Sequence, residues 1–475
     1  MSKNNTLCIA EWQSFGVEDI KSVIADKSEV KATKIFNELK NFADDKGNHI
    51  FLNSYGKNRL KARNYVGLIQ TKSGFCLEIL PKTFRTEKFD ENIKCSDKKD
   101  CKCPICKAKD ILLKMLQTLR DSPFKQSHIS NLKTHKFPLL EIFANMFLDE
   151  LECLIKRGIK SDYVVREENR AFLKGKLLFS ENLKHNFAHK ERFFTASDEF
   201  IPDIAPNRLI VSTLLLLSKC NFSAKTSTRI LQSRFVFEGI AHSQNYDKDF
   251  AKCENLRHFK SYEILLLWCK IFLKRHNFMP YQGGDKAFAL LFDMNALFES
   301  FVAFHLKREC GEGHNIKAQE KSKYLVEING KRKFQINPDI VCYENGAKSA
   351  RFIADTKWKI LDSSRNDYGI SQGDLYQLFA YLAKYQCDKG YLIYPKITDT
   401  SKESNSTQEA QIPREFIYKA HICFFDENRF DEKQLDENQK ENLQIHKKQN
   451  LTLQIYFFDC QNPQDSAHYI LQTKS

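Results

Sequence analysis

The chain of 475 residues lacks several features that would assign it to common protein classes. No apolar run is long enough to span a bilayer, and the run at 214–217 ends at Ser218 and Lys219. The first residues, MSKNNTLCIAEW, have no signal-peptide core, so we expect a cytoplasmic protein. The phosphate-binding pattern G-x-x-x-x-G-K-[ST] is also absent, so the chain offers no recognisable site for a nucleotide fuel.

What the chain does have is apolar content and positive charge. Hydrophobic residues make up 42% of the sequence, which is ample for packed cores, and the length predicts two or three domains. The net charge is +14 and the pI about 9.0, which favours a polyanionic partner, with nucleic acid as the first candidate. A chain rich in lysine throughout would show the same balance without such a partner.

The fifteen cysteines are odd in number and mostly scattered, which is typical of buried thiols in a reducing compartment. The exception is a group in the polar segment 84–110, formed by Cys95, Cys101, Cys103 and Cys106. The Cys103-Pro-Ile-Cys106 spacing is that of a zinc knuckle, and four thiolates satisfy tetrahedral zinc. Structural zinc is one interpretation; free surface thiols and an iron–sulfur cluster are the alternatives.

The pattern of apolar residues predicts a multidomain α+β or α/β chain in three segments. Residues 1–110 carry strand candidates (TLCIAEW, NYVGLIQ, FCLEILPK) and form a β-rich contact domain with the cysteine group. Residues 111–280 are mainly helical, with a basic and aromatic stretch between the helices. Residues 281–475 begin at a hinge-like Gly283-Gly284 pair and form a mixed sheet flanked by helices.

The stretch at 337–360, NPDIVCYENGAKSARFIADTKWKI, carries the strongest chemical signal. Two apolar runs flank Asn345-Gly346, which predicts a two-residue hairpin turn. Asp355 and Lys357 are two apart on the second strand and share a face, and pairing across the hairpin brings Asp339 beside them. Carboxylates suit Mg²⁺, so we expect Asp339 and Asp355 to bind the metal and Lys357 to orient the attacking water.

This set resembles the PD-(D/E)xK nuclease signature, with Pro338-Asp339 followed by Asp355-Thr356-Lys357. A surface hairpin with a solvated charge pair is the alternative. The flanking segments support the nuclease interpretation, because a helix with Glu299 at the edge of its apolar face precedes the hairpin and another helix follows it. Between these two helices lie three strand candidates, YLVEI, KFQINPDI and RFIA, and a fourth, YLIYP, follows the second helix. The resulting order of helix, three strands, helix and strand is the core layout of that nuclease fold.

Two further positions complete the candidate set. Gln377 and Tyr381 are four apart on the later helix, and Gln377-x-x-x-Tyr381 resembles an extra motif of the RecB-like branch of these nucleases. Glu299 is either another metal-shell residue or a solvated helix residue.

Taken together, the segments resemble McrC, the nuclease subunit of McrBC-type restriction systems. The resemblance runs through GLIQTKSGFCLEILPK, LKGKLLFSENLKHN, DEFIPDIAPNRLI, MNALFESFVAFHL, NPDIV, DTKWK and DLYQLFAYL, in that order. It implies an McrB-like AAA+ GTPase hexamer as partner, which binds and translocates double-stranded DNA and often senses modified cytosine such as 5-methylcytosine. McrC then stimulates the GTPase and cuts the DNA. The cysteine group is not expected of the family.

Three functions therefore remain open from the sequence. The leading one is a Mg²⁺-dependent endonuclease subunit of a GTP-dependent restriction complex, with two nuclease domains pairing to cut both strands. The second is a RecB-like nuclease that processes DNA ends without GTP. The third is a non-catalytic activator of the NTPase with a vestigial nuclease fold, against which the intact Asp339, Asp355 and Lys357 argue.

Overall fold

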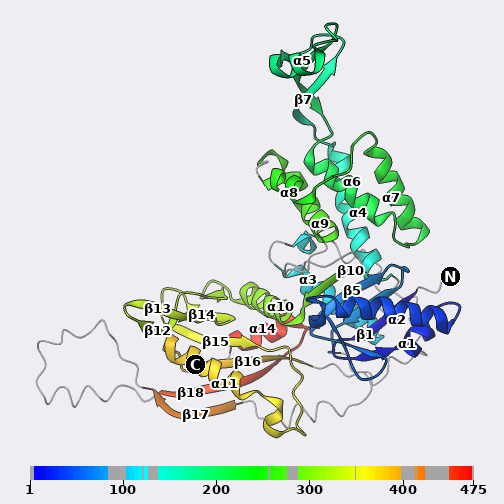
Figure 1. Ribbon diagram of the computed structural model, residues 1–475. Coiled ribbons are helices and arrows are strands. Elements are labelled where there is room, and N and C mark those ends of the chain that lie inside the picture. The colour runs from blue at the N-terminus through cyan, green and yellow to red at the C-terminus, as the bar shows by residue number, and fades with distance from the viewer. Residues whose placement is uncertain are drawn as a thin grey trace, which may run out of the picture.

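The computed structural model describes residues 5–83, 103–119, 122–126, 137–254, 257–274, 287–347, 349–396, 412, 415–422 and 449–472. It shows a mixed α/β protein with several sheets, which confirms the mixed class expected from the sequence (Figure 1). Among these residues, no helix combines the length and the apolar character needed to cross a membrane.

The N-terminal region is built on a four-stranded sheet in the order β1-β6-β5-β10. Its strands are β1 (Thr6–Ala10), β6 (Cys76–Leu80), β5 (Tyr65–Thr71) and β10 (Ala287–Asp293). Beside them lie α1 (Val17–Val23), α2 (Glu29–Asp44) and a small sheet of β2 (Ser14–Gly16), β4 (Arg59–Ala62) and β3 (Leu52–Ser54).

Strand β10 lies in the segment 281–475 that the sequence predicts to be the nuclease region, yet it pairs antiparallel with β5. The backbones approach so closely at Gly67 that an added Cβ would lie 2.0 Å from the carbonyl oxygen of Leu290. The division at residue 281 stays a prediction, but this strand belongs structurally to the N-terminal sheet. The Gly283-Gly284 pair lies outside the described residues.

The middle of the chain is a helical body around an aromatic core. It contains α3 (Pro104–Gln117), α4 (Leu139–Arg157), α6 (Ala205–Leu217), α7 (Ala224–Val236), α8 (Tyr246–Glu254) and α9 (Glu263–Leu273). Trp268 is fully buried there, with its ring 4.9 Å from that of Phe124 and 5.8 Å from that of Phe272. The apolar residues whose three- and four-residue spacing predicts these helices are the ones whose side chains fill this core.

A separate arm rises from this helical body (Figure 1). It consists of β7 (Asp162–Arg170), β8 (Lys176–Leu177), α5 (Phe179–Asn186) and β9 (Phe193–Ile201), with strand order β7-β9-β8. The basic and aromatic stretch noted in the sequence forms most of this arm.

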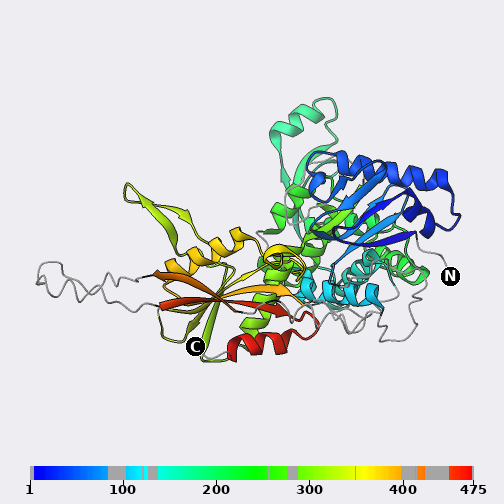
Figure 2. The same ribbon diagram turned by 90° about the horizontal axis from the view of Figure 1, so that it is seen from below.

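The C-terminal region contains a six-stranded mixed sheet in the order β11-β14-β15-β16-β18-β17. The strands are β11 (His314–Ala318), β14 (Ile340–Glu344), β15 (Ala350–Thr356), β16 (Lys389–Pro395), β18 (Gln449–Phe458) and β17 (Glu415–Ile422). Helix α11 (Gln372–Tyr385) covers one face, and α10 (Met294–Glu309) and α14 (Pro463–Gln472) cover the other (Figure 2). Gly390 lets α11 pack closely, since a Cβ there would lie 3.0 Å from Leu378 and Leu382.

Two local predictions were wrong. Among the described residues, the segment YLVEI does not join the main sheet: it forms β12 (Tyr324–Ile328), which pairs with β13 (Lys331–Gln335) in a two-stranded sheet, and β11 takes the expected core position. Asn345-Gly346 is not a two-residue hairpin turn, because residues 345–349 connect β14 to β15 and only Gly346 of the pair has positive φ. The backbone N–H of Asn345 instead donates to Gly313, which ties the turn to the preceding loop.

Candidate active site

Asp339, Asp355 and Lys357 meet at the end of two paired strands, as the sequence predicted. Asp339 immediately precedes β14, and the β14–β15 register pairs Ile340 with Ala354. The Lys357 ammonium lies 2.6 Å from Oδ2 of Asp355. Oδ2 of Asp339 accepts hydrogen bonds from the backbone N–H and the hydroxyl of Thr356, both at 2.7 Å. The sheet therefore holds two carboxylates and a lysine at one place.

Glu299 of α10 belongs to the same electrostatic cluster. Burial, together with the negative charges of Asp339 and Asp355, raises its pKa to about 7. Burial and the neighbouring charge of Asp339 likewise raise the pKa of Asp355 to about 7, although Lys357 opposes the shift. The pKa of Asp339 is raised by burial against the opposing hydrogen bonds from Thr356. Burial raises the pKa of all three carboxyl groups, and the charge of Asp339 adds to the shift of the other two, so the site favours the arrival of positive charge.

Gln377 and Tyr381 reach the site from α11. Gln377 Oε1 accepts a hydrogen bond from the Lys357 ammonium at 3.1 Å, and its Nε2 donates to the Tyr381 hydroxyl at 2.7 Å. That hydroxyl donates to the carbonyl oxygen of Asn337 at 3.2 Å. The helical spacing of four thus places both side chains in one chain of hydrogen bonds between Lys357 and the loop that carries Asp339.

The sequence analysis did not identify two nearby contributors. Oδ1 of Asp374 lies 3.8 Å from the Lys357 ammonium, and its Oδ2 accepts from Lys359 at 2.7 Å. Asp374 is three residues before Gln377, so its helical spacing was a usable signal. Thr356, which holds Asp339, is the variable position of the Asp-x-Lys motif and carried no signal.

A buried contact also ties the strand end that carries the candidate site to the N-terminal sheet. The indole N–H of Trp358, the residue after Lys357, donates to Oε1 of Glu11, which is 3% exposed. Lys82 donates from its backbone to the same oxygen at 3.2 Å and from its ammonium to the Trp358 carbonyl oxygen at 3.1 Å. No sequence pattern linked these three residues, because they are separated by up to 347 positions.

The carboxylate oxygens of this cluster are the type of donor that suits a divalent cation such as Mg²⁺. Asp339, Asp355 and Glu299 supply hard oxygens, and burial is the main cause of their raised pKa values. Within the described ranges, no three His, Cys, Asp or Glu side chains already converge as a complete metal site. A cation would therefore replace the present partners of the aspartates, Thr356 and Lys357, for part of their oxygens.

The proposed zinc group is only partly within the described residues. Cys95 and Cys101 lie outside them. Cys103 caps the N-terminus of α3, where its sulfur accepts from the backbone N–H of Cys106 at 3.4 Å, and Cys106 is buried. Helix capping and core packing account for these two thiols without metal, and zinc stays a prediction.

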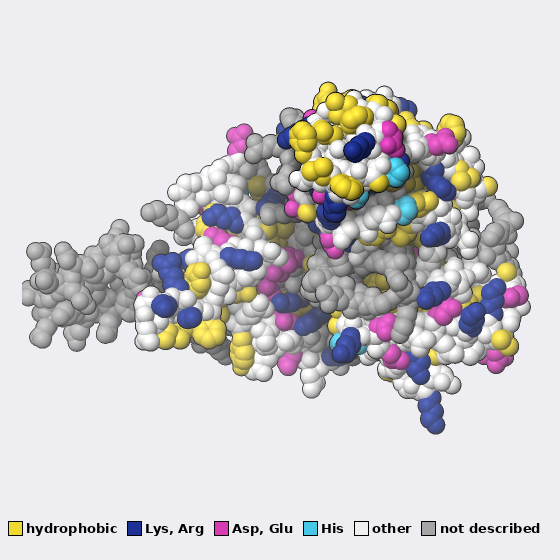
Figure 3. Space-filling view, turned by 45° about the horizontal axis from the view of Figure 1, so that its top comes forward, with side chains coloured by type: hydrophobic (Ala, Val, Ile, Leu, Met, Phe, Trp, Pro, Cys, Tyr) yellow, Lys and Arg dark blue, Asp and Glu magenta, His cyan; other side chains and the backbone are white. Residues whose placement is uncertain are grey.

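The arm displays a different kind of site, an apolar surface in solvent. Phe179 and Leu183 of α5 and its C-cap residue Phe187 follow one another at a spacing of four and are 73%, 67% and 81% exposed. Figure 3 shows yellow side chains gathered around the tip of the arm. A helix that presents its apolar stripe to water, rather than to a core, indicates an interaction surface.

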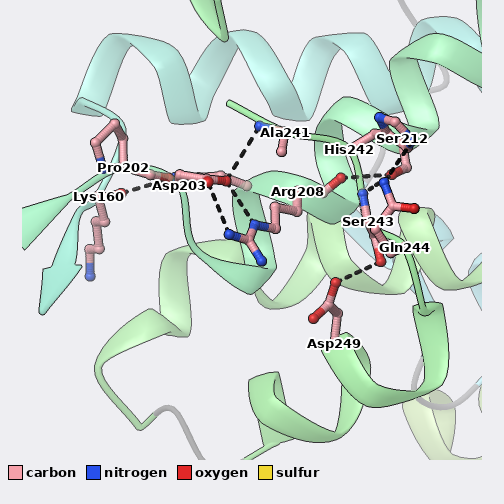
Figure 4. Close-up of polar contacts among 11 residues, drawn as sticks. Lys160, Pro202, Asp203, Arg208, Ser212, Ala241, His242, Ser243, Gln244 and Asp249 are labelled. Carbon is pink, nitrogen blue, oxygen red and sulfur yellow. Dashed lines mark hydrogen bonds and ion pairs between the residues drawn. The ribbon is translucent and has the colours of Figure 1, made fainter. Parts of the chain in front are cut away.

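The base of the arm is held firmly to the helical body (Figure 4). The side-chain amide of Asn207 donates to the carbonyl oxygens of Lys160 and Pro202, at 3.0 and 2.7 Å, so it joins the two ends of the arm. Next to this clamp, Asp203 accepts two hydrogen bonds from Arg208, at 2.7 and 2.9 Å. The arm is therefore a braced projection rather than a loosely tethered loop.

Comparison with known proteins agrees with this architecture. A solved assembly of Thermococcus gammatolerans McrB AAA+ hexamers with bound McrC contains a similar chain, at 18% identity and a TM-score of 0.57, covering 98% of this chain and 100% of that one. A second structure, of the McrBC complex from the same organism, matches at 21% identity and a TM-score of 0.42 over 65% of this chain and 88% of that one. No curated protein matches.

The family comparison covers three of the four strands of the N-terminal sheet, β5, β6 and β10, and the candidate active site. The model for the McrBC 5-methylcytosine restriction system component matches residues 60–395, which include β5, the helical body, the arm, Asp339, Asp355 and Lys357. This span exceeds half of the chain. The chain belongs to the McrBC 5-methylcytosine restriction system component family.

Proposed function

We propose that this chain is the DNA-cleaving subunit of a restriction complex, with a PD-(D/E)xK nuclease site in its C-terminal region. The observation that carries the proposal is the convergence of Asp339, Asp355, Glu299 and Lys357 at one end of a mixed sheet. A solvated charge pair does not account for it, because Asp355 is only 1% exposed and its carboxyl sits among two other acids.

Asp339, Asp355 and Glu299 are the residues that would hold a Mg²⁺ ion. When bound, such an ion polarises the scissile phosphate and lowers the pKa of a coordinated water. The three acids create a negative electrostatic potential in a site that is largely shielded from solvent. A cation bound there is stabilised more strongly than one at an open surface.

Lys357 supplies the positive charge that the phosphate needs. Although burial lowers its pKa, the charge of Asp355 and their hydrogen bond raise it, so the ammonium stays protonated at neutral pH. Gln377, on α11, accepts a hydrogen bond from this ammonium. Tyr381 donates a hydrogen bond to the carbonyl oxygen of Asn337, two residues before Asp339. The two residues act by position, keeping the lysine and the aspartate aligned for the displacement at phosphorus.

The arm supports a role in a complex with an AAA+ GTPase. The related McrC chain is bound to McrB AAA+ hexamers, and the present chain matches that chain over its full length. The stripe of Phe179, Leu183 and Phe187 is the apolar surface that such a partner would cover. The braced base would transmit a push on the arm to the helical body rather than absorb it. We therefore place a GTPase contact on the arm, in addition to the N-terminal contact expected from the sequence.

A reconstituted cleavage assay tests this function. The purified chain is mixed with the McrB-like GTPase encoded with it, and circular plasmid with or without 5-methylcytosine is added together with GTP and Mg²⁺. Cleavage of the modified circle only when the GTPase and GTP are present supports the proposal. Degradation of linear DNA from its ends without GTP would instead identify a RecB-like nuclease, and GTPase stimulation without any cleavage would identify a non-catalytic activator.

A further inference from the structure

The β12–β13 hairpin projects from the C-terminal region without joining the main sheet (Figure 2). Its strands are joined by Asn329-Gly330, both with positive φ (51° and 69°), which is a tight two-residue turn. Five-residue strands give a ribbon about 17 Å long. An isolated two-stranded ribbon is marginally stable by itself, so its projection into solvent calls for a binding role.

The hairpin is connected directly to the candidate active site. Only residues 336–338 separate the end of β13 from Asp339. At the other side of its base, the backbone N–H of Gln319 donates to the carbonyl oxygen of Asp339 at 2.8 Å, and that of Ile336 donates to Lys323 at 3.0 Å. Whatever the ribbon binds is therefore held next to the catalytic carboxylates.

The surface of the ribbon is basic and apolar together. Lys331, Arg332 and Lys333 are exposed, and in the described part of the chain none of them forms an ion pair. The register places Lys331 opposite Ile328 and Lys333 opposite Val326, so each ammonium shares a face with an exposed apolar side chain. Figure 3 shows dark blue and yellow side chains side by side at the end of this projection.

We propose that the β12–β13 hairpin is a DNA-binding ribbon that holds the duplex against the cleavage site. A two-stranded ribbon fits the major groove, whose width is about 12 Å. Its exposed cations meet phosphates, although Arg332 lies opposite Glu327 in the register, and its apolar side chains contact sugars and base edges. The proposal rests on the nuclease function proposed above and names the surface by which that site takes its substrate.

The test compares the full-length chain with a variant carrying Lys331→Gln, Arg332→Gln and Lys333→Gln. The matched control removes the same charge from exposed lysines of the N-terminal region, with Lys34→Gln, Lys40→Gln and Lys46→Gln. Binding to a fluorescent 30-base-pair duplex is measured by anisotropy in EDTA over a series of NaCl concentrations. Cleavage of modified plasmid with the GTPase is measured in parallel.

Loss of three phosphate contacts should make the slope of log K against log [NaCl] shallower by about 2 to 3 and weaken binding at 0.1 M salt by at least about tenfold. The N-terminal control should keep the slope of the unaltered chain. An unchanged slope in the hairpin variant, with cleavage intact, would overturn the ribbon proposal and leave the nuclease function standing. Loss of assembly with the GTPase but not of DNA binding would identify the hairpin as a protein contact. Failure of the unaltered chain to bind and cut DNA would overturn both proposals.

Discussion

Trp358→Phe tests whether the buried contact between the N-terminal sheet and the strand end positions Lys357. The substitution keeps most of the ring, whose centroid lies 5.2 Å from that of Phe298, but removes the N–H that donates to Glu11. The Glu11 side chain is completely buried and would keep the Lys82 backbone N–H, at 3.2 Å, and the more distant Lys82 ammonium, at 3.8 Å. Losing a hydrogen bond to a buried charged group costs about 1.5–3 kcal/mol.

Part of that free energy should be lost from transition-state stabilisation, because Trp358 follows Lys357 directly and its displacement would move the lysine. If about half of it is lost from the transition state, the cleavage rate at saturating DNA falls about 4- to 12-fold. Metal affinity, measured by calorimetry, should change little, since Asp339, Asp355 and Glu299 are untouched. Single-turnover cleavage in the presence of the GTPase measures the rate.

Trp268→Phe is the matched control. Trp268 is equally buried, but in the described structure its indole N–H has no hydrogen-bond partner and its ring packs in the helical core. The control should lower the free energy of unfolding without slowing cleavage. If Trp358→Phe also lowers only stability and cuts at the rate of the unaltered chain, the contact is structural and the positioning argument is wrong.

Four further predictions follow from the site and its surroundings. Lys357→Met should abolish cleavage but leave Mg²⁺ binding at pH 8 at least as tight in calorimetry, because it removes a competing cation; unchanged cleavage would make Lys357 a surface lysine. Mg²⁺ affinity should fall about ten- to a hundredfold from pH 8 to pH 6, since Asp355 and Glu299, with pKa values of about 7, bind protons over that range, and Glu299→Gln should flatten this dependence. Leu183→Ser should weaken GTPase binding and stimulation while DNA binding by the isolated chain persists, and normal stimulation would exclude the α5 stripe as a contact. Elemental analysis should find about one zinc per chain, lost in Cys103→Ser, if the four thiolates share a metal; an equally stable metal-free chain would favour free thiols.

The chemistry of the candidate site could be predicted because several of its residues are only two or four positions apart in the sequence. The two-residue step from Asp355 to Lys357 and the four-residue step from Gln377 to Tyr381 fix shared faces on a strand and on a helix, and the contacts in the structure follow those faces. Long-range contacts left no such trace. The pairing of β10 with β5 and the hydrogen bond from Trp358 to Glu11 join residues more than 200 positions apart.

The two wrong local predictions have a common cause. YLVEI has the apolar composition of a core strand, but its alternate partners on β13 are Gln335, Lys333 and Lys331, whose polar side chains favour solvent, and the pair forms a projecting ribbon. Asn345-Gly346 has the composition of a tight turn, but tertiary hydrogen bonds to the loop at Gly313 determine its conformation. In both places, contacts made elsewhere in the chain overrule the local preference.

The most direct test of the central claim is cleavage by an Asp355→Ala chain reconstituted with the GTPase, with GTP hydrolysis measured in the same reaction. The substitution removes one of three crowded carboxyls, so the fold should persist, and the arm is untouched. We predict that cleavage of the modified plasmid falls by orders of magnitude while stimulation of GTP hydrolysis remains. Cleavage at the unaltered rate would contradict the assignment of Asp355 and, with it, the nuclease site proposed for this chain.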